Sequence, residues 1–154
     1  MLVCGLDIAD NKGLTDFELV EYAKELKIKY FRGVFMRDSL PLRPHNKECG
    51  IVNFNKSAQS GSHWVCYFKD DHQRIYFDSF GQVTPIEIQN YLKTSSERFS
   101  NKQVIQRNTD IVQRVNTRVC GHLCLLVLTL LTRKHLSYQG VLNILNDGYS
   151  RGDW

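Results

Sequence analysis

The apolar residues in the middle of the chain are concentrated in three short segments separated by polar stretches. Residues 50–54, 64–68 and 74–78 are rich in β-branched and aromatic side chains, which favour strands. A polar stretch of hairpin length, residues 69–73, separates the second segment from the third, and a longer loop, residues 55–62, separates the first from the second. The pattern predicts three successive strands that pair antiparallel.

Helical patterns precede and follow these strands. Thr15 and Glu18 have the spacing of a capping box, and the apolar residues that follow fit one face of a helix over residues 16–27. Residues 120–131 are almost continuously apolar, which indicates a buried helix. Further helices are predicted at 85–94 and 138–146, and further short strands at 30–36, 104–106 and 111–112.

The composition and length restrict the class of protein but do not indicate a function. The chain has 154 residues, of which 42% are hydrophobic and 23% charged, as in ordinary globular proteins. This length favours a single domain spanning residues 1–154. The longest apolar stretch, residues 123–131, falls well short of the ~20 residues that cross a bilayer. The first residues lack the basic leader and the apolar length of a signal peptide, so we expect an intracellular protein without a membrane partner.

The five cysteines make an odd number without the dense spacing of a disulfide-stapled fold, so reduced thiols are expected. Cys120, His122 and Cys124 are close enough in sequence to raise the question of a metal site. On a helix, however, His122 would point away from the face that the two thiols share, so no metal is expected. The thiols expected merely to pack in the core are Cys49, Cys66 and Cys124.

The net charge of +4 is unevenly distributed along the chain. From Lys93 to Lys134 there are eight basic residues against two acidic ones. Such a surface could bind a polyanion such as DNA, yet an ordinary solvated surface explains the same pattern. No interleaved aromatic pattern or nucleic-acid motif in the sequence decides between the two interpretations.

Cys120 stands where a polar loop gives way to the apolar helix, and this position favours a reactive thiolate. Backbone N–H groups and the positive end of the helix dipole stabilise a thiolate at a helix N-terminus. A thiolate that attacks a carbonyl needs a general base, and His63 at the start of a predicted strand is the candidate. The hairpin brings this strand start opposite the end of the next strand, where Asp78 could orient the imidazole. Gln113 could donate to the oxyanion together with the N–H of Cys120.

Each of these residues also has an ordinary structural explanation. A lone histidine is more often a hydrogen-bonded structural residue, and Asp78 begins an Asp-Ser-Phe-Gly sequence that is typical of turns. The strand context and the downstream Asp78 favour the catalytic interpretation of His63. Gln103 and Gln106 compete with Gln113 for the role of oxyanion donor.

Several motifs resemble those of the adenovirus protease (adenain) family and its relatives in viruses and virus-like mobile elements. The Gly-Ser-His-Trp of residues 61–64 is similar to the family's Gly-x-His-Trp, and residues 120–124 match its Cys-Gly-x-x-Cys. Residues 75–81 resemble the stretch that carries the acidic triad member before Phe-Gly, with aspartate where adenain itself has glutamate. Residues 30–35 and 49–53 resemble the family's Tyr-Phe-x-Gly segment and its Cys-Ala-Ile-Val-Asn strand.

The resemblance implies an α+β fold in which a central mixed β-sheet packs against a buried helix that carries the nucleophile at its N-terminus. It assigns the nucleophile to Cys120, and the base, the acid and the oxyanion donor to His63, Asp78 and Gln113. It also implies a monomeric cysteine endopeptidase that cleaves viral precursor proteins near Gly-Gly or Gly-x sites during particle maturation. The expected location is the host nucleus or cytoplasm and the virion. The thiol chemistry requires no cofactor, although the family implies stimulation by DNA or by an activating peptide.

Two other functions stay open at the level of sequence. The same fold could serve a peptidase for ubiquitin-like modifiers, which also end in Gly-Gly. Alternatively, the basic surface could make the chain a non-enzymatic DNA- or capsid-binding module in which Cys120 merely packs. Cleavage of a panel of ubiquitin-like modifier fusions would separate the first alternative from a viral endopeptidase. A Cys120→Ala variant that binds DNA and keeps full biological function would favour the second alternative.

Overall fold

The computed structural model describes residues 2–3, 6–7, 12–57, 62–93 and 104–154. Within these residues the chain forms a five-stranded mixed sheet whose spatial order follows the order in sequence. Its strands are β3 (Phe31–Met36), β4 (Glu48–Asn53), β5 (Trp64–Lys69), β6 (Arg74–Phe77) and β7 (Ile105–Arg107). The three central strands pair antiparallel, as predicted, whereas β3 and β7 join the two edges in parallel. Two further strands, β1 (Leu2–Val3) and β2 (Leu6–Asp7), pair antiparallel and come first in the chain.

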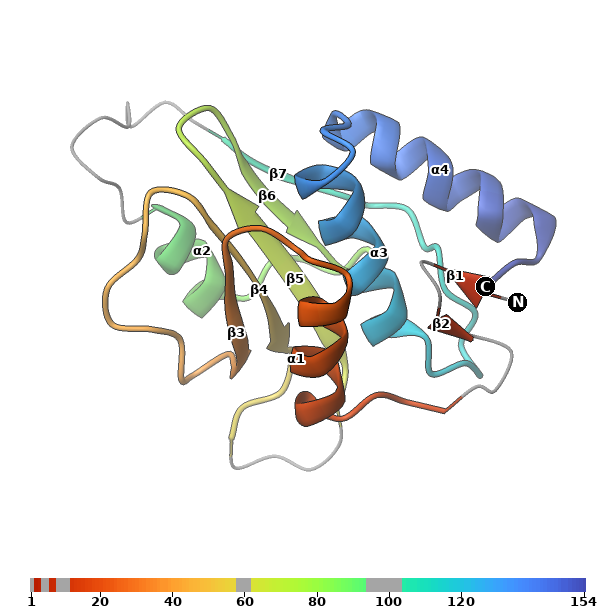
Figure 1. The fold of residues 1–154 in the computed structure, drawn as a ribbon, viewed down its shortest axis with the longest axis horizontal. Helices are drawn as coiled ribbons and strands as arrows, with labels where there is room; N and C mark the ends of the chain where they lie inside the picture. The colour runs from red at the N-terminus through yellow and green to blue at the C-terminus, as the bar shows by residue number, and fades with distance from the viewer. Residues whose placement is uncertain (1, 4–5, 8–11, 58–61, 94–103) are drawn as a thin grey trace.

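Helices cover both faces of the sheet (Figure 1). The helices in the described residues are α1 (Asp16–Glu25), α2 (Ile86–Lys93), α3 (Cys120–Thr132) and α4 (Tyr138–Arg151). Figure 1 shows α2 on one side of the sheet and α3 on the other, with α4 beyond α3. The sheet is therefore the middle layer of an α+β fold.

The two faces of the sheet bury two separate apolar clusters. On the side of α3, Ile51 and Phe77 belong to one cluster with Leu123 of the helix. On the opposite side, Val65 belongs to a smaller cluster with Ile88 of α2. Because both faces are covered, the central strands carry nearly continuous apolar runs instead of the alternation that a half-exposed strand shows.

The predicted buried helix is α3, which has no charged residue and is buried along almost its whole length. Its two threonines satisfy their hydroxyl groups inside the helix. Thr129 Oγ1 donates to the carbonyl of Leu125 at 2.7 Å, and Thr132 Oγ1 donates to that of Leu128 at 2.8 Å. The helix can therefore lie within the core without unpaired hydroxyl groups.

Two predicted elements differ from the structure. The strand expected at 111–112 is wrong, because Val112 instead donates its N–H to the carbonyl of Ser79 at 2.8 Å and buries its side chain. The last helix extends to Arg151, beyond the predicted end at 146, and it ends at Gly152 in the left-handed conformation. The other predicted helices and strands are present, with ends shifted by a few residues.

Three of the cysteines behave as the packing residues that the sequence predicts. Cys49, Cys66 and Cys124 are buried free thiols in the core cluster on the α3 side. Cys4 lies outside the described residues. In the described part of the chain, no helix combines the length and the apolar character that a membrane span needs.

We expect Leu128→Ala to destabilise the protein by about 2–5 kcal/mol, because Leu128 is fully buried in the helix that packs on the sheet. The matched control is Leu42→Ala, which removes the same atoms from a side chain that is 99% exposed. Chemical denaturation of both variants measures the difference in the free energy of unfolding. Similar stabilities for the two variants would contradict the assigned core.

Candidate active site

Cys120 is the first residue of α3 and lies beside the start of β5, the central strand of the sheet. Its side chain is largely buried, and the backbone N–H of Trp64 donates to Sγ at 3.4 Å. The N-cap residue, Val119, makes no side-chain capping bond to the first turn. The N–H groups of that turn are therefore not taken up by a capping side chain and can stabilise negative charge at the sulfur.

Gly121 permits the close packing that surrounds the thiol. A Cβ atom at this position would lie 3.2 Å from side-chain atoms of both Leu19 and Trp64. A larger residue would require these two side chains to shift by a few tenths of an ångström. The tight packing around Gly121 therefore explains why a glycine follows the cysteine in this motif.

His63 and Asp78 meet where two paired strands begin and end. His63 directly precedes β5, Asp78 directly follows β6, and these strands pair antiparallel. Nε2 of His63 and Oδ1 of Asp78 are 2.7 Å apart, so the predicted proximity of the two side chains is confirmed. Aspartate is one methylene shorter than the glutamate of adenain, and its carboxylate still reaches the imidazole of His63. Because Nε2 faces Asp78, Nδ1 is the ring nitrogen left for Cys120.

The surroundings of His63 favour its charged form. Burial lowers the pKa of His63, but hydrogen bonds to Asp78 and Cys120, together with their negative charges, outweigh burial and raise that pKa from 6.5 to about 9. The imidazole therefore carries a proton at neutral pH when the thiolate is present. This is the charge distribution that a nucleophilic thiolate requires.

Aromatic rings and a buried amide hold this pair in place. The ring of His63 lies between those of Phe54 and Phe80, with centroid distances of 5.7 and 5.1 Å. The N–H of Phe80 donates to Oδ1 of Asp78 at 2.9 Å. Asn108 binds the backbone of Asp78 twice, accepting from its N–H at 3.0 Å and donating to its carbonyl at 2.5 Å.

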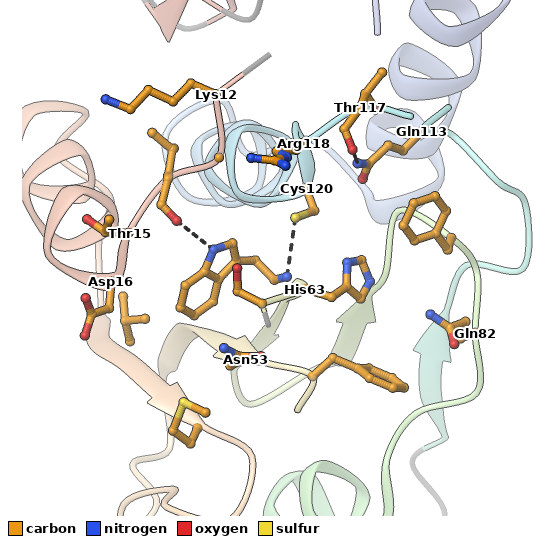
Figure 2. Close-up of a pocket in the computed structure, with 18 of the residues that line it drawn as sticks. Lys12, Thr15, Asp16, Asn53, His63, Gln82, Gln113, Thr117, Arg118 and Cys120 are labelled. Carbon is orange, nitrogen blue, oxygen red and sulfur yellow. Dashed lines mark hydrogen bonds between the residues drawn. The ribbon is translucent and has the colours of Figure 1, made fainter. Parts of the chain in front are cut away.

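Gln113 is buried at the same site and is held by two neighbours. Ser79 Oγ donates to Oε1 of Gln113 at 2.5 Å, and Nε2 of Gln113 donates to the carbonyl of Thr117 at 2.9 Å. Figure 2 shows Gln113 and Thr117 beside Cys120. An amide nitrogen carries two hydrogens, so a second N–H is left for a bound oxygen atom.

A cleft of about 1070 Å³ reaches these residues. Cys120, His63 and Gln113 line it (Figure 2), and so do apolar side chains such as Met36 and Val34. The structure therefore brings all four predicted site residues together and places Cys120 in the wall of a cleft.

Other contributors to the site escape sequence reasoning. Asn108 and Ser79 act through hydrogen bonds to residues about thirty positions away, which leave no periodic signal in the sequence. The backbone N–H of Trp64 carries no side-chain signature at all. Only the aromatic Phe80 could have been anticipated, because it lies in the Phe-Gly motif that follows Asp78.

A mixed sheet packed on a buried helix, with a thiol at the helix start and an imidazole–carboxylate pair at the facing sheet edge, is the fold of a class of cysteine peptidases. The chain belongs to the adenovirus endoprotease family, because the sequence pattern of that family matches residues 31–146. The resemblance inferred from the sequence motifs is thereby confirmed.

Two relatives illustrate the relationship. The protease of Bovine adenovirus 2 is 27% identical over 128 residues, which cover 75% of this chain and 62% of that protein. The crystal structure of the ASFV pS273R protease shares the fold, with a TM-score of 0.58, 17% identity, and coverage of 86% of this chain and 62% of the other. A second crystal structure of that protease gives a TM-score of 0.55. The chain thus spans about six tenths of the length of these relatives.

We expect Asp78→Asn to lower the pKa of His63 from about 9 towards 6.5, because the carboxylate supplies both a hydrogen bond and a charge that raise it. An NMR titration of the His63 ring measures this change. An unchanged pKa in the variant would contradict the assigned pair.

The raised pKa of His63 also predicts a pH-dependent stability. A folded-state pKa above the unfolded value stabilises the fold fully below about pH 6.5, and this contribution is lost as the pH rises through about 9. The stability advantage of the wild type over Asp78→Asn should therefore shrink between pH 6.5 and pH 9. Denaturation at several pH values measures it, and a constant difference would argue against the linkage.

Proposed function

We propose that this chain is a cysteine endopeptidase in which Cys120 is the nucleophile. The observation that carries the proposal is the His63–Asp78 pair, 2.7 Å apart, beside a thiol at the N-terminus of a buried helix. Membership of the adenovirus endoprotease family supports the same reaction class. A merely packed cysteine would not need a charged imidazole next to it, a donor N–H at its sulfur and a cleft leading to it.

The reaction then proceeds in two halves. The Cys120 thiolate attacks the scissile carbonyl carbon, and the developing oxyanion is held by the N–H of Cys120 and by Nε2 of Gln113. His63 gives its Nδ1 proton to the departing amine, the C–N bond breaks, and a thioester remains on Cys120. His63 next takes a proton from water, whose oxygen attacks the thioester carbon. The C–S bond then breaks, which releases the carboxylic acid and leaves Cys120 as a thiolate beside the protonated imidazole. Asp78 keeps the imidazole oriented throughout.

The substrate we propose is a polypeptide, namely viral precursor proteins cut near Gly-Gly or Gly-x sites. The family relationship supports this substrate class. The residues of the proposed site act with their own thiol, imidazole, carboxylate and amide groups, so this mechanism requires no bound cofactor. Cleavage assays test this substrate preference directly. They compare peptides that have glycine at the cleavage site with peptides that have larger residues there, and with ubiquitin-like modifier fusions.

We expect an electrophilic peptide ending in Gly-Gly to modify the protein once, at Cys120. Intact-mass and peptide-mapping mass spectrometry locate the adduct. Cys120→Ala should remove the adduct, whereas the matched control Cys124→Ala should keep it, because the Cys124 thiol is fully buried and burial raises its pKa. An adduct at Cys66 or Cys124 in place of Cys120 would refute the assignment.

A further inference from the structure

Ser79 directly follows the proposed acid and is fully buried. Its Oγ donates to Oε1 of Gln113 at 2.5 Å, and its carbonyl accepts the N–H of Val112 at 2.8 Å. The turn after β6 is thus bonded directly to the segment that carries Gln113. Sequence motifs placed Ser79 only next to Asp78 and gave it no role.

The two partners of the Gln113 amide fix which way it points. The carbonyl of Thr117 can only accept, so the amide atom 2.9 Å from it must be the nitrogen. Oε1 then faces Ser79, whose hydroxyl must donate to it. The orientation therefore follows from hydrogen-bonding chemistry and not from the assignment of nitrogen and oxygen positions.

We propose that Ser79 is a positioning residue that fixes the Gln113 amide with its nitrogen available to the oxyanion. The inference rests on the proposed function, in which Gln113 is an oxyanion donor. Without the Ser79 hydroxyl, Oε1 loses a buried partner and the amide can rotate about its side chain. A donor that is free to rotate stabilises the transition state less well than a fixed one, because fixed donors require no reorganisation during the reaction.

The same turn carries the acid. Asn108 holds the backbone of Asp78, while the next residue, Ser79, holds Gln113. Gly81 brings this turn close to the following segment, because its φ is +65° and a Cβ there would collide with the backbone of Thr109. Two adjacent residues of one turn therefore orient the imidazole and the oxyanion donor respectively.

The test compares two reactions of the same thiol in the full chain. Hydrolysis of a fluorogenic amide of a Gly-Gly peptide passes through an oxyanion, whereas alkylation by iodoacetamide forms an S–C bond and releases iodide without one. For Ser79→Ala we expect kcat for hydrolysis to fall roughly tenfold or more, with KM nearly unchanged. The rate of Cys120 alkylation should stay within roughly twofold of wild type, because the thiolate–imidazolium pair is intact.

Two further variants complete the comparison. Gln113→Ala should lower kcat by roughly 100-fold or more, and adding Ser79→Ala to it should cause little further loss. The matched control is Ser137→Ala, which removes the N-cap hydroxyl of α4 and so lowers stability far from the thiol while leaving kcat unchanged. If Ser79→Ala does not fold, Ser79→Cys, whose thiol is a weaker donor, takes its place.

The outcomes separate this inference from the proposed function. Full kcat in Ser79→Ala with an impaired Gln113→Ala overturns the positioning role alone. An equal slowing of hydrolysis and alkylation, or an undiminished effect of Ser79→Ala in the Gln113→Ala background, overturns it as well. Full kcat in Gln113→Ala removes the oxyanion role on which the inference rests. A wild-type chain that neither hydrolyses the amide nor reacts at Cys120 overturns the proposed function itself.

Discussion

The packing of α3 against the sheet is the constraint on which the rest of the site depends. The helix contains no Asp, Glu, Lys or Arg and buries nearly every residue, so moving it along or away from the sheet would expose apolar surface along its whole length. Its first residue, Cys120, is therefore fixed in space by contacts made many residues later in the same helix. Gly121 lets that first turn approach Trp64, whose backbone N–H reaches the sulfur. A large apolar interaction thus determines where a single polar atom lies.

The imidazole and the carboxylate are positioned by a different kind of interaction. Backbone pairing between β5 and β6 sets the register that places His63, just before β5, beside the turn that follows β6. Side-chain contacts then fix the positions of the two groups more closely. Asn108 forms two hydrogen bonds with the backbone of Asp78, and the ring of Phe80 lies against the imidazole. The thiol of Cys120 and the imidazole of His63 therefore reach the same place through independent causes, namely helix packing and strand pairing. A substitution that weakens one of them need not disturb the other.

This division explains what the sequence could predict. The capping box at Thr15, the apolar helix and the three strands are local patterns, and the structure contains all of them. The proximity of His63 and Asp78 followed from hairpin geometry. In contrast, the parallel edge strands and the roles of Asn108 and Ser79 depend on contacts between segments far apart in sequence, which no periodicity records. The failed strand at 111–112 has the same origin, because its N–H is bonded to a turn instead of to a strand.

The pKa of His63 bears on the order of the proton transfers in the proposed mechanism. Two residues raise its pKa, and they differ in permanence: the Asp78 carboxyl group is unchanged by the reaction, whereas the sulfur of Cys120 becomes acylated. In the free site, both contributions keep the imidazole protonated at neutral pH, ready to give its proton to the departing amine. Once the thioester has formed, the hydrogen bond and the charge of Cys120 no longer raise the pKa of the imidazole, whereas those of Asp78 still do. The ring can then accept a proton from water. The same side chain is thus an acid before acylation and a base after it, because it has given its proton to the departing amine and the acylated sulfur no longer favours the protonated ring.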